Sequence, residues 1–225
     1  MQNLRTPPED ATAKVIAAAH GSPRRSPVRE RDLAFVLSMA STGCRYSELA
    51  RLRFSDLVRS PDGAARALVL GKGHGQVRFS DLKGGVVTRK KPADKRRHVF
   101  FAADALRALD AYRLARGGDP PSGDWLFLEH CRGGRAGART LRAVAVDLAT
   151  SAGVRPHFRF TSHSLRHDFA VRAIRATGDL ALVQDLLGHA SPVSTRVYAT
   201  LTVDDLARGH ARVPPPAAPA RPVLA

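Results

Sequence analysis

The sequence predicts an α+β fold that is mainly α-helical and contains a small antiparallel β-sheet. Two observations support this prediction. Apolar side chains recur at helical spacing over most of residues 6–57 and 102–212, between polar caps and glycine stops. Residues 64–101 instead contain short apolar and β-branched runs separated by glycine-rich turns, which is typical of consecutive strands.

The length of 225 residues suits one sizeable domain or two small ones, at roughly 100–200 residues per domain. No internal repeat is apparent. We expect a single domain over residues 1–213, followed by a disordered tail over residues 214–225, which is rich in proline and alanine.

The chain is strongly basic, with a formal net charge of +16 and an isoelectric point near 11.2. Such a charge favours a polyanionic partner through counterion release and long-range attraction, and nucleic acid is the first candidate. The alternative is a chain that codon usage has enriched in arginine, because Arg and Ala are abundant throughout.

The two cysteines, Cys44 and Cys131, form no C-x-x-C pair and no zinc knuckle, which indicates a reducing, intracellular setting. The amino terminus lacks the apolar core of a signal peptide, and no run approaches the ~18–20 apolar residues that span a bilayer. We therefore expect a soluble, cytoplasmic protein with no membrane partner.

In chain order, a first helix is expected to open at Thr6-Pro-Pro-Glu-Asp, with acidic residues in its first turn, and to continue from Ala11 to His20 until Gly21. A loop rich in Pro, Ser and Arg leads to a second, buried helix from about Glu30 to Ser41. Thr42-Gly43 ends that helix and places Arg45 at the start of the next one.

Arg45 and Glu48 lie three residues apart on this third helix, whose core side is marked by Leu49 and Leu52. Taken alone, their spacing fits an ordinary surface ion pair that contributes at most about 1 kcal/mol.

Strands are expected at Ala67 to Leu70, at Gly85 to Thr88 and at Arg97 to Phe101. Gly71-Lys72-Gly73 is not a phosphate-binding P-loop, because no Gly-Lys-Ser/Thr follows it. An amphipathic helix from Ala102 to Arg116 comes next. The central part of the chain is completed by a short buried strand from Trp125 to Leu128, a Gly/Arg loop from Cys131 to Arg139 and a helix from Thr140 to Ala152.

The stretch from Phe160 to Tyr198 carries the residues best suited to chemistry. His163 and Arg166 are three apart on a predicted helix and share a face, so an imidazole and a guanidinium can reach one small anion such as a phosphate. His163 and His167 also have a spacing that binds zinc. However, a guanidinium lies between them and no catalytic glutamate does, so we predict no metal ion.

Gly178 is expected to end this helix and Asp179 to cap the next, which has an apolar stripe and ends at Gly188. The stripe consists of Leu180, Val183, Leu186 and Leu187. His189 follows the glycine stop, where the helix dipole alone could also favour it.

Ser191-Pro192 is expected to open a short helix that carries Tyr198 about two turns in. Tyr198 is either a core residue or a candidate nucleophile, because nearby cations favour the phenolate over the ordinary phenol pKa of about 10. A terminal helix is expected from Thr202 to Arg212.

Two of these runs carry a resemblance. The run His163-Ser-Leu-Arg166-His, followed by Leu-Gly-His189 and then Tyr198, resembles the carboxy-terminal signature of the tyrosine recombinase (phage integrase) family. Upstream, the run Thr-Gly-Cys-Arg-Tyr-Ser-Glu-Leu, which continues to Leu57, resembles that family's first arginine box.

The resemblance covers roughly residues 6–212 and implies the catalytic-domain fold of the family, so that residues 1–213 are a single catalytic domain. The helical DNA-binding domain that family members usually carry upstream is expected to be absent. The resemblance also implies roles for individual residues: Arg45 and Arg166 bind the scissile phosphate, His163 and His189 orient it or exchange protons, Tyr198 is the nucleophile, and Glu48 helps to hold the site.

The family also places a catalytic lysine in a β-hairpin turn, where it protonates the leaving 5′-hydroxyl. We favour Lys91 for this role, because the segment after it passes directly into the helix that starts at Ala102. Lys90 is its close rival, and Lys72 lies in a competing turn.

The implied function is site-specific DNA recombination, in which strands are cleaved and religated through a 3′-phosphotyrosyl link. That link stores the bond energy, so the resemblance implies no metal, ATP or other cofactor. The implied partners are double-stranded DNA and further copies of the chain, assembled on DNA as a homo-oligomer such as a tetramer. Two alternatives stay open: a type IB topoisomerase-like enzyme, which works without synapsis, and a non-catalytic DNA-binding accessory module of the same fold.

Overall fold

The structure is a computed structural model, and side chains of residues 76–80 and 86–90 are not described. The described residues are 8, 10–61, 63–70, 76–80, 86–90, 96–121, 123–129, 134–155 and 158–188.

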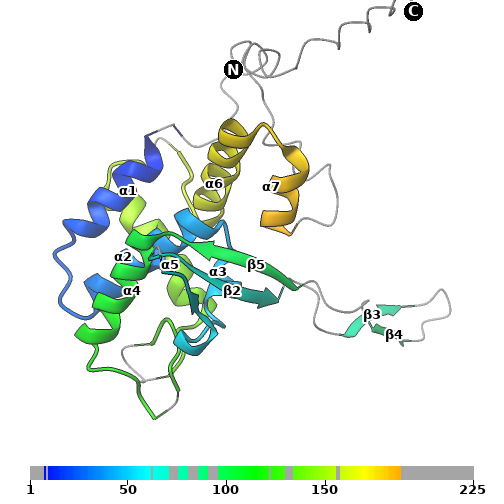
Figure 1. Ribbon diagram of the computed structural model, residues 1–225, viewed down its shortest axis with the longest axis horizontal. Helices are drawn as coiled ribbons and strands as arrows, with labels where there is room; N and C mark the ends of the chain where they lie inside the picture. Colours follow the sequence, from blue (N-terminus) through cyan, green and yellow to red (C-terminus); the bar gives the residue numbers. More distant parts are fainter. Residues whose placement is uncertain are drawn as a thin grey trace, which may run out of the picture.

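The described part of the chain is mainly helical with a small antiparallel sheet, which confirms the predicted fold class (Figure 1). The helices are α1 (Ala11–His20), α2 (Val28–Thr42), α3 (Tyr46–Leu49), the 3₁₀ helix η1 (Phe54–Asp56), α4 (Ala103–Ala115), α5 (Ala138–Ser151), α6 (Ser162–Thr177) and α7 (Leu180–Leu187). The strands are β1 (Val58–Arg59), β2 (Ala65–Leu70), β3 (Gln76–Ser80), β4 (Val86–Lys90) and β5 (Arg96–Phe101).

The main sheet has three antiparallel strands in the order β1-β2-β5, with Val69 opposite Arg97 and Leu70 opposite Arg96. The three predicted strands are found as β2, β4 and β5, but β4 does not join this sheet. It pairs with β3 in a separate two-stranded ladder, which Figure 1 draws apart from the helices. Neither β3 nor β1 was predicted, and the two residues of β1 are too few to show a period of two.

The buried face of the sheet follows from strand alternation. Every second residue of β2, from Ala65 to Val69, is buried, and so are Val99 and Phe101 of β5. These side chains join one core with α1, α2, α4 and α5. Helix α2 lies at the centre of this core, because it contacts α1, α4, α5 and α6 as well as β5.

Helices α6 and α7 share a second, small apolar cluster, which consists of Ala170, Ile174, Val183 and Leu187. The predicted stops and caps of these helices are confirmed. Gly178 and Gly188 both adopt the left-handed conformation, with φ of 68° and 64°, and the Asp179 carboxylate accepts a hydrogen bond from the Leu182 N–H at 2.9 Å.

Two local predictions were wrong. The first turn of α1 contains no acidic residue, because Asp10 is the N-cap itself and pairs with Lys14 at 2.5 Å. Residues 125–128 are not a strand, because Trp125 bridges to Arg53 while Leu128 bridges to Arg135, so no continuous ladder forms. The predicted burial of Leu126 to Leu128 is nevertheless confirmed.

Several predictions lie outside the described residues: the short helix at Ser191-Pro192, the terminal helix from Thr202 to Arg212 and the tail over residues 214–225. Within the described ranges, no helix combines the length and the apolar character needed to cross a membrane.

Candidate phosphate-binding site

Glu48 is the centre of a buried cluster at the end of α3. Its side chain is 3% exposed, and each carboxylate oxygen accepts two hydrogen bonds. Oε2 accepts from the Arg45 backbone N–H at 2.8 Å and from Arg97 Nη2 at 2.7 Å. Oε1 accepts from Arg45 Nη1 at 2.9 Å and from Arg97 Nη1 at 3.1 Å. The predicted contact of Arg45 with Glu48 is therefore present, but it is not a surface ion pair.

Glu48 stays ionised in this environment. Burial alone raises the pKa of its carboxyl group, but the hydrogen bonds and charge of Arg97, together with those of Arg45, outweigh burial and hold that pKa below its ordinary range. The reciprocal effect of Glu48 raises the pKa of Arg97 despite its burial. The three groups thus form a charged unit rather than a neutral hydrogen-bonded one.

Arg97 is a member of the cluster that sequence reasoning missed. It lies on β5 with its side chain 8% exposed, and its Nε donates to the Leu186 carbonyl at the end of α7, at 3.0 Å. A signal was available in the sequence, because Arg97 shares the parity of the inward residues Val99 and Phe101. An arginine at an inward position of a strand requires a buried partner.

Arg166 reaches the same region from the first half of α6 and is 3% exposed. Its Nη1 donates to the Gly43 carbonyl and its Nη2 to the Leu187 carbonyl, both at 2.7 Å. These bonds tie the turn before Arg45 to the end of α7, and they fix the plane of the guanidinium without neutralising its charge. We call Arg45, Glu48, Arg97 and Arg166 the arginine cluster.

Gly43 permits the close approach of α6 to this turn. Its φ of 60° is left-handed, and a Cβ added there would lie 2.4 Å from a ring carbon of Phe169 on α6. The same Cβ would lie 3.0 Å from Leu187 Cδ2. Only glycine fits both the backbone conformation and the space, which explains in physical terms why the predicted stop of α2 is a glycine.

His163 lies beside the arginine cluster on the first turn of α6. Its backbone N–H donates to Thr161 Oγ1 at 3.2 Å, as part of the N-cap of the helix. The exposed imidazole meets the ring of Tyr46 edge-on, with ring centroids 6.4 Å apart. The structure thus brings His163 into contact with the residue that directly follows Arg45.

The cluster carries an excess of positive charge, since it contains three guanidinium groups, two of them bound to Glu48, and a single carboxylate. Arg45 is the most accessible of the three, with its side chain 25% exposed against 8% for Arg97 and 3% for Arg166. An anion approaching from solvent would therefore reach Arg45 before the more deeply buried Arg97 and Arg166. Such a layered arrangement suits a phosphodiester.

The remaining predicted site residues cannot be placed in this geometry. Lys72, Lys91, His189 and Tyr198 lie outside the described residues, and Lys90 ends β4 in a segment without described side chains. His189 directly follows Gly188, whose neighbour Leu187 is held by Arg166.

Cys44, between Gly43 and Arg45, does not compete as a nucleophile. Its side chain is fully buried, and burial raises the pKa of the thiol to about 11. Across the described ranges, no group of three or more His, Cys, Asp or Glu residues is arranged to hold a metal ion.

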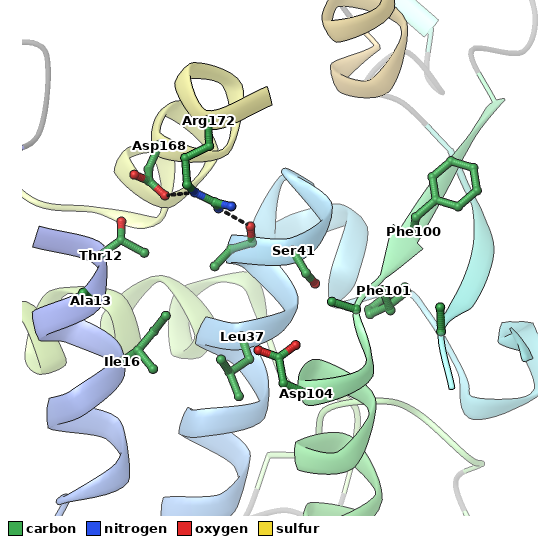
Figure 2. Close-up of a pocket in the computed structure, with 13 residues that line it drawn as sticks. Thr12, Ala13, Ile16, Leu37, Ser41, Phe100, Phe101, Asp104, Asp168 and Arg172 are labelled. Carbon is green, nitrogen blue, oxygen red and sulfur yellow. Dashed lines mark hydrogen bonds and ion pairs between the residues drawn. The ribbon is translucent and has the colours of Figure 1, made fainter. Parts of the chain in front are cut away.

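A pocket of about 630 Å³ lies elsewhere, between α1, α2 and α6 and the junction of β5 with α4. Figure 2 shows Arg172 of α6 beside it, bonded to Asp168 and to the Ala40 carbonyl at 2.8 and 2.6 Å. No member of the arginine cluster lines this pocket. The pocket is therefore separate from the candidate site.

Comparison with known sequences places the chain in a family. The profile described as "Phage integrase family" matches residues 8–204, which is most of the chain. Tyrosine recombinase XerC of Actinobacillus pleuropneumoniae serotype 7 (strain AP76) is 32% identical over 202 residues, covering 89% of this chain and 57% of the relative. Tyrosine recombinase XerD of Mycobacterium tuberculosis (strain ATCC 25618 / H37Rv) is 33% identical over 204 residues, covering 88% and 57%. The chain thus spans little more than half the length of these relatives.

Comparison with solved structures gives the same answer for the fold. The crystal structure of XerA recombinase superposes with a TM-score of 0.67 at 29% identity, covering 93% of this chain and 65% of that one. The post-cleavage complex of XerH site-specific recombinase with its palindromic difH substrate gives a TM-score of 0.72 at 24% identity, covering 93% and 54%. These matches, the family profile and the two arginine motifs agree, and the chain belongs to the phage integrase family as a tyrosine recombinase catalytic domain.

Proposed function

We propose that this chain cleaves and religates duplex DNA at specific sites, as the catalytic part of a site-specific recombinase. The observation that carries the proposal is the arginine cluster, in which Arg45 and Arg97 share the carboxylate of Glu48, Arg166 holds the turn before Arg45, and His163 packs against the neighbouring Tyr46. A phosphodiester under attack gains charge on its non-bridging oxygens, and preorganised guanidinium groups stabilise that charge.

In the proposed reaction, the Tyr198 oxygen attacks the phosphorus atom and the bond to the 5′-oxygen breaks. The phenol proton passes to His163 or His189, either of which can exchange protons near neutral pH. The lysine, Lys91 or its rivals Lys90 and Lys72, donates a proton to the departing 5′-oxygen. The product is a 3′-phosphotyrosyl link and a free 5′-hydroxyl, and attack by a 5′-hydroxyl reverses each step.

This chemistry requires neither ATP nor a metal ion. The phosphotyrosyl bond conserves the energy of the phosphodiester that it replaces, so no second energy source is needed for religation. Arg45 and Arg166 would supply the positive charge that metal ions supply in other phosphoryl-transfer sites.

The proposed partners are duplex DNA and further copies of the chain. The net charge of +16 supports a polyanionic partner. The XerH structure that resembles this chain contains its difH substrate, and we expect duplex DNA to occupy the corresponding surface here. Exchange between two DNA sites needs more than one active site, so we propose a homo-oligomer on DNA, with a tetramer as the working arrangement.

The test is covalent trapping on nicked DNA. The binding site is first selected from a random DNA pool with the full 225-residue chain. A nicked duplex with that site is then incubated with wild type and with Tyr198→Phe, and adducts are resolved on a denaturing gel. We expect an adduct with wild type only, at equal DNA binding. A wild-type protein that binds but forms no adduct would indicate an accessory DNA-binding module instead.

A second assay distinguishes recombination from topoisomerase activity. Wild type is incubated with supercoiled plasmids that carry one or two copies of the selected site. We expect strand exchange between two copies. Relaxation of the plasmid without any exchange would favour the type IB topoisomerase-like alternative.

A further inference from the structure

We infer that Arg97 is a positioning residue of the proposed cleavage site, which fixes both Arg45 and the end of α7 in one geometry. This inference rests on the proposed function. Three nitrogen atoms of Arg97 donate hydrogen bonds to two different elements. Nη1 and Nη2 donate to the Glu48 carboxylate on α3, and Nε donates to the Leu186 carbonyl on α7. Its side chain is 8% exposed, so it acts from behind the surface that DNA would contact.

The first consequence concerns Arg45. Glu48 would fully neutralise Arg45 if the two formed an isolated pair, and such a pair attracts a phosphate weakly. Because Arg97 shares both oxygens of the same carboxylate, at 2.7 and 3.1 Å, the trio keeps one net positive charge. The same bonds prevent rotation of the carboxylate, so Arg45 Nη1 is held in one orientation at 2.9 Å.

The second consequence concerns the end of α7. The last carbonyls of a helix have no partner within it, and here Leu186 is bound by Arg97 while Leu187 is bound by Arg166. Two cations at a helix carboxy terminus also interact favourably with the helix dipole. The end of α7 is therefore held by two side chains of the arginine cluster: Arg97, which shares Glu48 with Arg45, and Arg166, which also binds the carbonyl of Gly43.

Gly188 shows how closely Arg97 fits this helix end. A Cβ at Gly188 would lie 2.8 Å from Arg97 Cδ and 3.1 Å from its Nη1, and φ is 64°. Arg97 therefore packs against the backbone of the residue that precedes His189. Displacement of Arg97 would change where the chain toward His189 and Tyr198 leaves α7. A shift of about 1 Å at a reacting group can cost about 100-fold in rate.

The experiment measures cleavage separately from binding. Wild type, Arg97→Gln, Arg97→Lys and Arg66→Gln are compared on the nicked substrate for the single-turnover cleavage rate at saturating DNA, the Kd and the Tm. Arg66 is the matched control, an exposed arginine on the neighbouring strand β2. We expect Arg97→Gln to cleave about 100-fold more slowly at unchanged Kd. Arg97→Lys restores the charge but not the fork, so it should recover only part of the rate. Arg66→Gln should cleave as wild type does.

A double-mutant cycle with Glu48→Gln tests whether Arg97 acts on cleavage through Glu48. It also provides a measurable protein if Arg97→Gln alone does not fold. If Arg97→Gln unfolds because Glu48 is left buried with Arg45 as its remaining partner, the double variant removes that charge and restores a measurable protein. Residues that act as one unit lose less together than the product of their separate losses. We expect that result here.

Three outcomes would overturn the inference: wild-type cleavage by Arg97→Gln, a loss confined to Kd, or losses that multiply fully with those of Glu48→Gln. Absence of cleavage by wild type would instead reject the proposed function itself. The two failures are thus distinguishable in one set of measurements.

Discussion

At the residue scale, Glu48 makes the arginine cluster depend on its own ionisation. Four hydrogen bonds from two arginines converge on this buried carboxylate, and they hold its pKa below the ordinary value of 4.5. A carboxyl group with a depressed pKa in the folded state stabilises that state above its unfolded pKa. This contribution disappears as the pH falls through the folded pKa.

The stability advantage of wild type over Glu48→Gln should therefore depend on pH. We expect a difference in the free energy of unfolding on the order of 3 kcal/mol at pH 7, because the variant leaves Arg97 without its anionic partner. The difference should shrink once the pH falls below 4.5, the ordinary value for Glu48. Urea unfolding of both proteins from pH 7 to pH 3 measures it.

The other carboxylates are common to both proteins, so their titration cancels in this difference. Asp110→Asn is the matched control, because Asp110 forms an exposed pair with Arg59 and is 46% exposed. Its loss should change the free energy of unfolding by no more than about 0.5 kcal/mol. A Glu48→Gln difference that stays constant from pH 7 to pH 3 would contradict the proposed charge state.

At the element scale, the junction of α2 with α6 and α7 depends on Gly43. Gly43→Ala places a methyl group 2.4 Å from a Phe169 ring carbon, in addition to straining a left-handed backbone. We expect it to lower the free energy of unfolding by about 1–3 kcal/mol more than Gly153→Ala does. Gly153 has a similar φ of +67° but nothing within 4 Å of the added carbon.

Urea unfolding of the two alanine variants measures this difference. Both variants lose the left-handed freedom of glycine, at roughly 1–2 kcal/mol each, so only the overlap with α6 separates them. Equal destabilisation would show that Phe169 moves aside at no cost.

The difference between local and long-range interactions explains which elements could be predicted from the sequence. The end of α6 and both ends of α7 depend on local signals, namely the glycines at positions 178 and 188 and the Asp179 cap, which are readable within a few residues. The strand predicted at residues 125–128 is not found, because the pairing partners of these residues, Arg53 and Arg135, are set by the tertiary fold. The pairing of β4 with β3 rather than with β2 is likewise a choice between distant partners, which strand periodicity alone does not decide.

The residues of the candidate site also differ in whether the sequence alone could identify them. Arg45, Glu48, His163 and Arg166 could be named from two short motifs, since each motif places its residues on one helical turn. For Arg97, strand parity indicates an inward position, but its partner could not be predicted, because that partner depends on the register of β5 on β2 and lies 49 positions away in the sequence. The placement of Lys91, His189 and Tyr198 stays a prediction.

At the scale of the whole molecule, the net charge of +16 should dominate the affinity for DNA. A protein that neutralises 6–10 phosphates loses roughly 10³–10⁵ in affinity between 50 and 200 mM salt, through counterion release. We expect a loss in this range for the full chain on its selected site, measured by fluorescence anisotropy. Sucrose at matched osmolality is the control and should leave the Kd unchanged. A loss below about tenfold would argue against extensive phosphate contact.

The pairing of Leu70 with Arg96 has a consequence for how this protein can vary. The 25 residues between them, which include β3 and β4, leave the sheet and return to the same place. The entropy of closing such an excursion grows only slowly with its length, so shortening or lengthening it costs the sheet little. All three lysine candidates lie within it. The proposed proton donation and the folding of the sheet are thus encoded in separable parts of the chain, so that substitutions can change one without altering the other.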